Sequence, residues 1–311
     1  MTVHHITAIA GDPQRNLDFY AGVLGLRLVK LTVNFDDPTS YHLYYGDELG
    51  RPGTIMTFFA WPGAARSRVG PPQVTATAFA VPADSLDYWQ SRLQMHNPSP
   101  ADRLDERAIR FTDPDGIALE IVATPRPAGK PWAGGAVPVE HAIRGFHSVT
   151  ISEEGYESTA RVLTDLMGFK PAGSEGNRFR YRAAGADGFA STVDLLCVPD
   201  APHGGMGAGI VHHVAFRTPD DAHQGAWRTR IKGAGLNVSP VMDRAYFHSI
   251  YYREPGGVLF EVATDHPGFA VDEPAERLGT KLMLPAQHER HRSEIERIVP
   301  KLRLPGIAGV S

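Results

Sequence analysis

The order of strand-like and helix-like segments repeats four times along this 311-residue chain. Each copy has one alternating apolar segment, then a helix-like segment, then three more strand-like segments, the order βαβββ. Individual residues repeat as well. Asp113-Pro114-Asp115-Gly116 precedes Glu120, and Glu254-Pro255-Gly256-Gly257 precedes Glu261 in the same way. Self-similarity at this scale indicates a duplicated supersecondary unit. The sequence therefore predicts an α+β fold built from four βαβββ modules.

The first module shows the pattern most clearly. Residues 3–10 alternate as a strand does, and Asp12-Pro13 then supplies a helix cap followed by proline at the first helical position. Leu17, Phe19, Tyr20, Val23 and Leu24 give the helix one apolar face, and Gly25 can end it. The three strands that follow are expected at residues 26–35, 41–45 and 54–60.

A segment rich in proline and glycine separates the two halves of the chain. We therefore predict an N-terminal pair of modules at residues 1–124, a linker at 125–143 and a C-terminal pair of modules at 144–266. The remainder, 267–311, is a C-terminal tail with a helix expected from Glu289 to Val299.

Composition narrows the classes of partner. The chain has 42% hydrophobic and 21% charged residues and a formal net charge of −4, so no basic surface is expected for nucleic acid or for an anionic membrane. The N-terminus lacks the apolar segment of a signal peptide, and we expect a cytoplasmic protein with a small-molecule substrate. The composition leaves open whether the protein forms a homo-oligomer. The single cysteine leaves histidine and carboxylate as the expected metal ligands.

Two histidine doublets lie in strand-like segments, His4-His5 near the start and His212-His213 in the fourth module. Since strand side chains alternate between faces, only one histidine of each doublet is expected to point into a given barrel. Aligning the modules places the second histidine of each doublet in register with His147 of the third module. The second module has Ala76 at that position.

The closing strands provide the third ligand. The same alignment gives one shared position occupied by Thr57, Glu120, Asp194 and Glu261 in the four modules. If the fourth module pairs with the third, the triad is His147, His213 and Glu261. If it pairs with the first, the triad is His5, His213 and Glu261. The residues themselves leave both pairings open.

The chain resembles the vicinal oxygen chelate superfamily, which includes glyoxalases and extradiol dioxygenases, and most closely its hydroquinone ring-cleaving dioxygenases. The segments that carry this resemblance are His4-His5-Ile6-Thr7, the run from Asp243 to Gly257 and Leu278-Gly279-Thr280-Lys281-Leu282. The resemblance implies two cupped mixed β-sheet barrels, with the first and last modules meeting around a metal. It favours His5, His213 and Glu261 as metal ligands over the set with His147.

The resemblance also implies a chemistry. The metal would be Fe(II), with Mn(II) as the main competitor, and the reactants would be a hydroquinone or related phenol and dioxygen, both of whose atoms enter the opened ring. Thr7, His212, Arg244 and Tyr251 match positions that contact substrate or support the metal ligands. Because of strand alternation, His212 is expected to face away from the cup. His4 and His248 are expected on the outside or at the rim.

Three further expectations follow from the alignment. Glu120, His147 and Asp194 would face a second cup, the metal-free remnant of a duplicated site. A glyoxalase-like lyase or isomerase is the first alternative function, although Thr57 stands where that arrangement generally needs a second glutamate. A metal-free module that sequesters drugs is the other alternative, and it leaves the inward histidines unexplained.

Overall fold

The structure is a computed structural model that describes residues 1–305 except 126, 128 and 186–188. Its strands form two mixed eight-stranded sheets. The first, in the order β14-β15-β16-β13-β1-β4-β3-β2, contains β1 (Val3–Ala10), β2 (Arg27–Val33), β3 (Tyr41–Gly46), β4 (Ile55–Ala60), β13 (Ile210–Thr218), β14 (Met242–Asp243), β15 (Phe247–Arg253) and β16 (Leu259–Pro267). The second, in the order β10-β11-β12-β9-β5-β8-β7-β6, contains β5 (Gln73–Pro82), β6 (Ser99–Pro100), β7 (Ala108–Thr112), β8 (Ala118–Thr124), β9 (Phe146–Glu153), β10 (Phe169–Glu175), β11 (Arg178–Ala183) and β12 (Thr192–Cys197).

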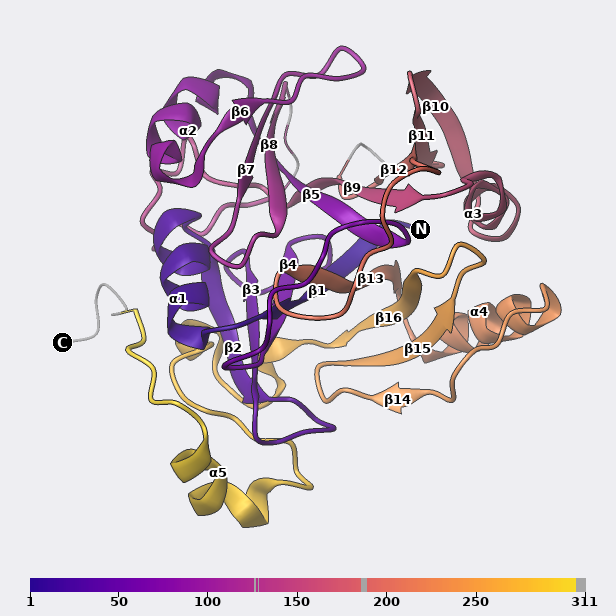
Figure 1. The fold of residues 1–311 in the computed structure, drawn as a ribbon. Helices are drawn as coiled ribbons and strands as arrows, with labels where there is room; N and C mark the ends of the chain where they lie inside the picture. Colours follow the sequence, from indigo (N-terminus) through magenta and orange to yellow (C-terminus); the bar gives the residue numbers. More distant parts are fainter. Residues whose placement is uncertain (126, 128, 186–188, 306–311) are drawn as a thin grey trace.

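Each sheet joins modules from opposite halves of the chain. Antiparallel pairing of β1 with β13 links the first module to the fourth, and pairing of β5 with β9 links the second to the third. In Figure 1 the indigo first module and the orange fourth module accordingly lie side by side, although they are at opposite ends of the sequence. This pairing confirms the prediction that the first and last modules meet. The boundaries of the two halves and of the linker stay predictions.

Helices connect the first two strands of each module. They are α1 (Pro13–Leu17), α2 (Leu86–Arg92), α3 (Glu157–Arg161) and α4 (Asp221–Gly233), and α5 (Arg292–Ile298) follows in the tail. The Asp12 side chain caps α1 by accepting a hydrogen bond of 2.8 Å from the Arg15 backbone, as the sequence predicts. A π-helical turn at Asp18–Val23 then completes the helical segment. No helix in the described part of the chain is long and apolar enough to cross a membrane.

One hydrophobic core runs through both sheets. It includes the fully buried side chains of Phe58 from the first module, Trp89 and Phe111 from the second and Phe169 from the third. Because apolar faces of all four modules meet in this core, the two sheets stabilise each other, and strands β1, β13 and β16 hold fixed positions relative to one another.

A β-bulge interrupts the opening strand of every module at the equivalent place. In the pairing of β1 with β13, and of β5 with β9, the unpaired residues are His4, His212, Thr75 and His147. A bulge places two residues of one strand opposite one residue of its partner and breaks the alternation of side chains.

The bulges correct the alignment of His147. Beyond the bulge of β13, His213 pairs with Thr7, whereas beyond the bulge of β9 it is Ser148 that pairs with Ala78. His147 therefore corresponds to His212, the first histidine of its doublet, and Ser148 takes the place of His213. The predicted register was wrong by one residue because the strict alternation that it assumed does not hold across a bulge.

Candidate metal centre

Three side chains from three neighbouring strands of the first sheet point toward one another. His5 lies on β1, His213 on β13 and Glu261 on β16, and they are 2%, 4% and 0% exposed. Glu261 Oε2 is 3.2 Å from His5 Nε2 and 2.8 Å from His213 Nε2. One ligand atom from each residue lies within 4.8 Å of the other two, and no second group of this kind occurs in the described residues. The predicted set is thus assembled, and the set with His147 is not.

The surroundings of Glu261 favour its ionised form. Burial alone would raise the pKa of Glu261, but the charges of His5 and His213 and their hydrogen bonds outweigh burial and hold this pKa well below its usual range. Burial lowers the pKa of His213, with Glu261 opposing. The Ser249 hydroxyl donates a hydrogen bond to Glu261 Oε1, and Oε2 has no partner among the described residues besides the two imidazole nitrogens.

Each triad histidine is supported by the histidine that precedes it. The Nδ1 atoms of His4 and His5 lie 2.9 Å apart, and those of His212 and His213 lie 2.8 Å apart. The expectation that His4 lies outside or at the rim is wrong, because the bulge folds its ring against His5 and leaves it 2% exposed. His212 is half-buried and packs its ring edge-on against Phe59.

Thr7, Arg244 and Tyr251 line the same cavity as the triad. Thr7 Oγ1 accepts a hydrogen bond of 3.2 Å from Thr57, and Tyr251 pairs across the strands with Glu261. Arg244 Nε donates to the Tyr251 hydroxyl over a long 3.4 Å. Burial, followed by the Glu261 charge, raises the pKa of Tyr251, so its hydroxyl keeps its proton at neutral pH. His248 does not line this cavity, and its Nδ1 contacts the Asp221 carboxylate of α4 at 2.6 Å.

The sequence analysis missed His42 and Tyr44, which also line the cavity. His42 Nε2 is 2.7 Å from Thr57 Oγ1, and its Nδ1 is 2.9 Å from the Tyr44 hydroxyl. Burial lowers the pKa of His42 well below its usual value. The available signal was strand alternation, since His42 and Tyr44 are two residues apart on β3 and therefore share a face with Thr57, which is opposite Tyr44 on β4.

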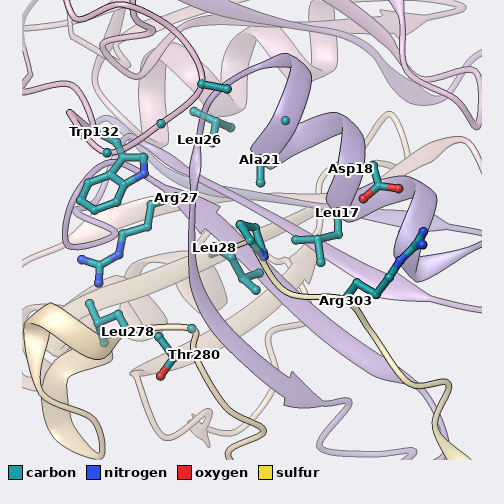
Figure 2. A pocket seen from close by; sticks show the side chains of 16 residues that line it. Leu17, Asp18, Ala21, Leu26, Arg27, Leu28, Trp132, Leu278, Thr280 and Arg303 are labelled. Atoms are coloured by element: carbon teal, nitrogen blue, oxygen red, sulfur yellow. The ribbon is translucent and has the colours of Figure 1, made fainter. Parts of the chain in front are cut away.

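The triad cavity is small and covered. Its volume is about 30 Å³, and the segment Asn34, Phe35 and Asp36 forms part of its wall. Arg244, in the turn between β14 and β15, donates to Asp36 at 3.2 Å, and His288 of the tail donates to the Phe35 carbonyl at 3.0 Å. A larger cavity, about 460 Å³, lies elsewhere and shares no lining residue with the triad cavity (Figure 2).

The second sheet holds arginines at the place equivalent to the triad. Glu120 and Asp194 are buried as predicted, but Arg103 lies 2.6 Å from Glu120, and Arg180 contacts Asp194 at 2.7 and 2.9 Å. His147 pairs with Glu106 at 3.1 Å and does not join the two carboxylates. The guanidinium groups therefore neutralise the carboxylates of the second cup directly.

Comparison with known proteins identifies the family. The model of the Glyoxalase/Bleomycin resistance protein/Dioxygenase superfamily matches residues 2–121 and 145–262. The chain is 49% identical to the putative ring-cleaving dioxygenase MhqO of Bacillus subtilis over 95% of both chains. It is 36% identical to the chlorohydroquinone/hydroquinone 1,2-dioxygenase of Sphingobium indicum, covering 95% of this chain and 94% of that one.

Solved structures agree. A crystal structure of a putative dioxygenase from Bacillus subtilis superposes with a TM-score of 0.94 at 47% identity over 98% of both chains. A glyoxalase I variant from Zea mays has a TM-score of 0.63 at 15% identity, covering 85% of this chain and 92% of that one, which shows the common fold. With its four modules, its two mixed sheets and these matches, the chain belongs to the Glyoxalase/Bleomycin resistance protein/Dioxygenase superfamily.

Proposed function

We propose that this protein is an Fe(II)-dependent ring-cleaving dioxygenase of the extradiol type that acts on a hydroquinone or a related phenol. Two independent observations support the proposal. The chain is similar over nearly its whole length to proteins named as ring-cleaving and hydroquinone dioxygenases. It also buries two imidazoles and one carboxylate in the arrangement that non-haem Fe(II) oxygenases use. The cytoplasmic location and the homo-oligomer stay predictions.

The observation that carries the proposal is the geometry around Glu261 Oε2. The neutral His4 ring has its Nε2 3.1 Å from the Thr264 carbonyl oxygen, which can only accept, so this nitrogen carries the proton. His4 Nδ1 is then an acceptor for His5 Nδ1–H, so the neutral form of His5, the form that binds a metal, has its lone pair on Nε2. That lone pair faces the fully buried carboxylate oxygen at 3.2 Å. Two lone pairs in this position repel, and a cation between them removes the repulsion.

His5, His213 and Glu261 would hold the metal through two nitrogens and one oxygen. Bound Fe(II) would supply the electron transfer to dioxygen and favour the phenolate form of the substrate, and this ligand set leaves positions open for both. Mn(II) accepts the same ligands, so the choice of iron rests on the dioxygenase relatives. His4 and His212 would fix the ring orientation of the two histidine ligands through their Nδ1 contacts.

The other cavity residues would bind and orient the substrate. Arg244 carries a permanent positive charge beside the triad, where it can stabilise anionic groups of the substrate as the ring opens. The protonated Tyr251 hydroxyl can donate a hydrogen bond at the same place. Thr7 of β1 accepts a hydrogen bond from Thr57 and presents its hydroxyl to the cavity. The covering segment at Phe35 would exclude water from the reacting groups.

The structure offers less support for the glyoxalase-like alternative. The position in β4 equivalent to Glu261 is Thr57, whose hydroxyl bonds His42 and Thr7, so the second carboxylate of that arrangement is missing from the first module. The likeness to glyoxalase I at 15% identity concerns the fold.

Oxygen uptake tests the proposal. The protein would be loaded with Fe(II) without air and mixed with dioxygen and hydroquinone, substituted hydroquinones or catechol. We expect one dioxygen consumed per ring with at least one hydroquinone, and no uptake above background in Glu261→Gln. Fe(II)-loaded protein that consumes no dioxygen with any of these phenols would refute the oxygenase.

A further inference from the structure

A cavity outside the triad lies where the linker and the C-terminal tail pack against the first module. It has a volume of about 460 Å³ and lies between the helical segment of the first module, the start of β2, the linker near Trp132 and the tail near Leu278. Figure 2 shows Trp132, Arg27 and Leu278 on one side of this cavity and Leu17, Asp18 and Arg303 on the other. Its volume is within the range of about 300–1,000 Å³ that is usual for small-molecule sites.

An arginine side chain without a counter-ion lies in its wall. Arg27 is 7% exposed, and no carboxylate oxygen of the described residues lies within 4.0 Å of its nitrogens. Its one hydrogen bond in the described part of the chain runs from Nη1 to the Glu48 carbonyl oxygen, at 2.5 Å. The guanidinium also lies 4.7 Å from the centre of the Trp132 ring. Because a guanidinium carries five N–H donors, most of them have no protein partner in the described part of the chain.

The surroundings do not compensate this charge. Burial lowers the pKa of Arg27, and nearby carboxylates, among them Glu48 and Glu273, oppose the shift only from beyond ion-pair distance. Glu273 already pairs with Lys30. An anion in the cavity would form the close ion pair that this guanidinium lacks among the described residues.

The other residues that line the cavity indicate which kind of group is attached to the anion. Leu17, Leu26, Leu28 and Leu278 give the cavity an apolar interior. On the far side the lining contains both Asp18 and Arg303, whose opposite charges offset each other. The lining thus fits a single carboxylate joined to an apolar body, with the planar carboxylate against the planar guanidinium.

Close backbone contacts hold the cavity open in one shape. A Cβ on Gly279 of the tail would lie 1.9 Å from the Leu28 carbonyl oxygen, and one on Gly135 of the linker would lie 2.5 Å from that of Gly25. Both segments therefore pack backbone to backbone against the first module. A preformed cavity of this kind loses little free energy to ordering when a ligand binds.

We propose that this cavity, here named the Arg27 cavity, is a second binding site that takes a monocarboxylate with an apolar body, whose carboxylate binds Arg27. The site is independent of the triad and of the dioxygenase proposal.

Calorimetric titration of the full-length protein tests the site, with octanoate as the probe and 1-octanol as the uncharged control. We expect octanoate to bind once per chain, at least tenfold more tightly than 1-octanol. Arg27→Met should weaken octanoate binding at least tenfold without changing the binding of 1-octanol. Equal octanoate affinities of wild type and Arg27→Met, or no octanoate binding to wild type, would overturn the proposal.

A second variant keeps the test independent of Arg27. Ala21→Phe adds a large side chain from a half-buried position of the helical segment into the cavity. It should abolish octanoate binding while the metal content of the triad and the thermal unfolding temperature stay at wild-type values. Undiminished octanoate binding by Ala21→Phe would place the ligand elsewhere and contradict the assignment.

Discussion

His4 meets His5 ring to ring at the bulge of β1, with their Nδ1 atoms 2.9 Å apart. The same contact, at 2.8 Å, recurs between His212 and His213 in β13. A bulge thus lets two consecutive residues act together, one as a candidate metal ligand and the other as the group that fixes its ring.

This contact gives the first prediction. His4→Phe keeps a ring of similar size but removes the Nδ1 acceptor, so His5 loses its fixed tautomer. We expect metal affinity to fall about 10–100-fold, as is usual when the partner of a ligand histidine is lost. Metal competition titration measures the change, and His248→Phe, outside the triad cavity, is the matched control. Equal affinities for the two variants would refute the supporting role of His4.

The second prediction concerns the cover of the triad cavity. A volume of about 30 Å³ admits about one or two waters, whereas an apolar cavity that binds benzene has roughly 150 Å³. An aromatic substrate must therefore displace the segment at Phe35. Phe35→Ala should raise kcat/KM for hydroquinones with bulky substituents about tenfold relative to unsubstituted hydroquinone. Steady-state oxygen uptake measures this ratio, and a ratio equal to that of wild type would contradict the covering role.

The third prediction is that the arginines of the second cup stabilise the fold and have no part in metal binding. Arg180→Met leaves the buried carboxylate of Asp194 and the half-buried carboxylate of Glu106 without one of their main partners. We expect the free energy of unfolding to fall by about 3–5 kcal/mol, the usual cost of breaking a buried ion pair. Denaturant unfolding measures the loss, and metal binding by the folded variant should be unchanged. A loss below about 1 kcal/mol would show that the pair is not needed for stability.

The lowered pKa of Glu106 predicts that the free energy of unfolding depends on pH. Burial would raise its pKa, but the hydrogen bond and charge of His147, and then those of Arg180, lower this pKa to about 2 from 4.5. Because the folded-state pKa is depressed, the stabilisation is complete above pH 4.5 and is lost as the pH falls toward 2. It amounts to at most about 3 kcal/mol. The difference in unfolding free energy between wild type and Glu106→Gln should shrink as the pH falls from 5 to 3, and a constant difference would contradict this shift.

The repeat made the fold and the triad predictable from the sequence. Matching doublets in the first and fourth modules, together with the family resemblance, favoured the pairing of these two modules, and β1 and β13 are indeed neighbours. Alternation alone could not predict the bulges, which depend on pairing between distant strands, so His147 was misaligned and His4 was placed outside. His42 was missed for a related reason, since its role rests on its contact with Thr57 from another strand.

Metal analysis of two alanine variants tests the central claim that the first and last modules share one metal. His5→Ala and His147→Ala would be reconstituted with Fe(II) without air, and bound iron would be measured per chain after desalting. We predict that His5→Ala loses the iron and that His147→Ala retains about one iron per chain, because His147 lies on the other sheet beside Glu106. Loss of iron in His147→Ala with retention in His5→Ala would contradict the account.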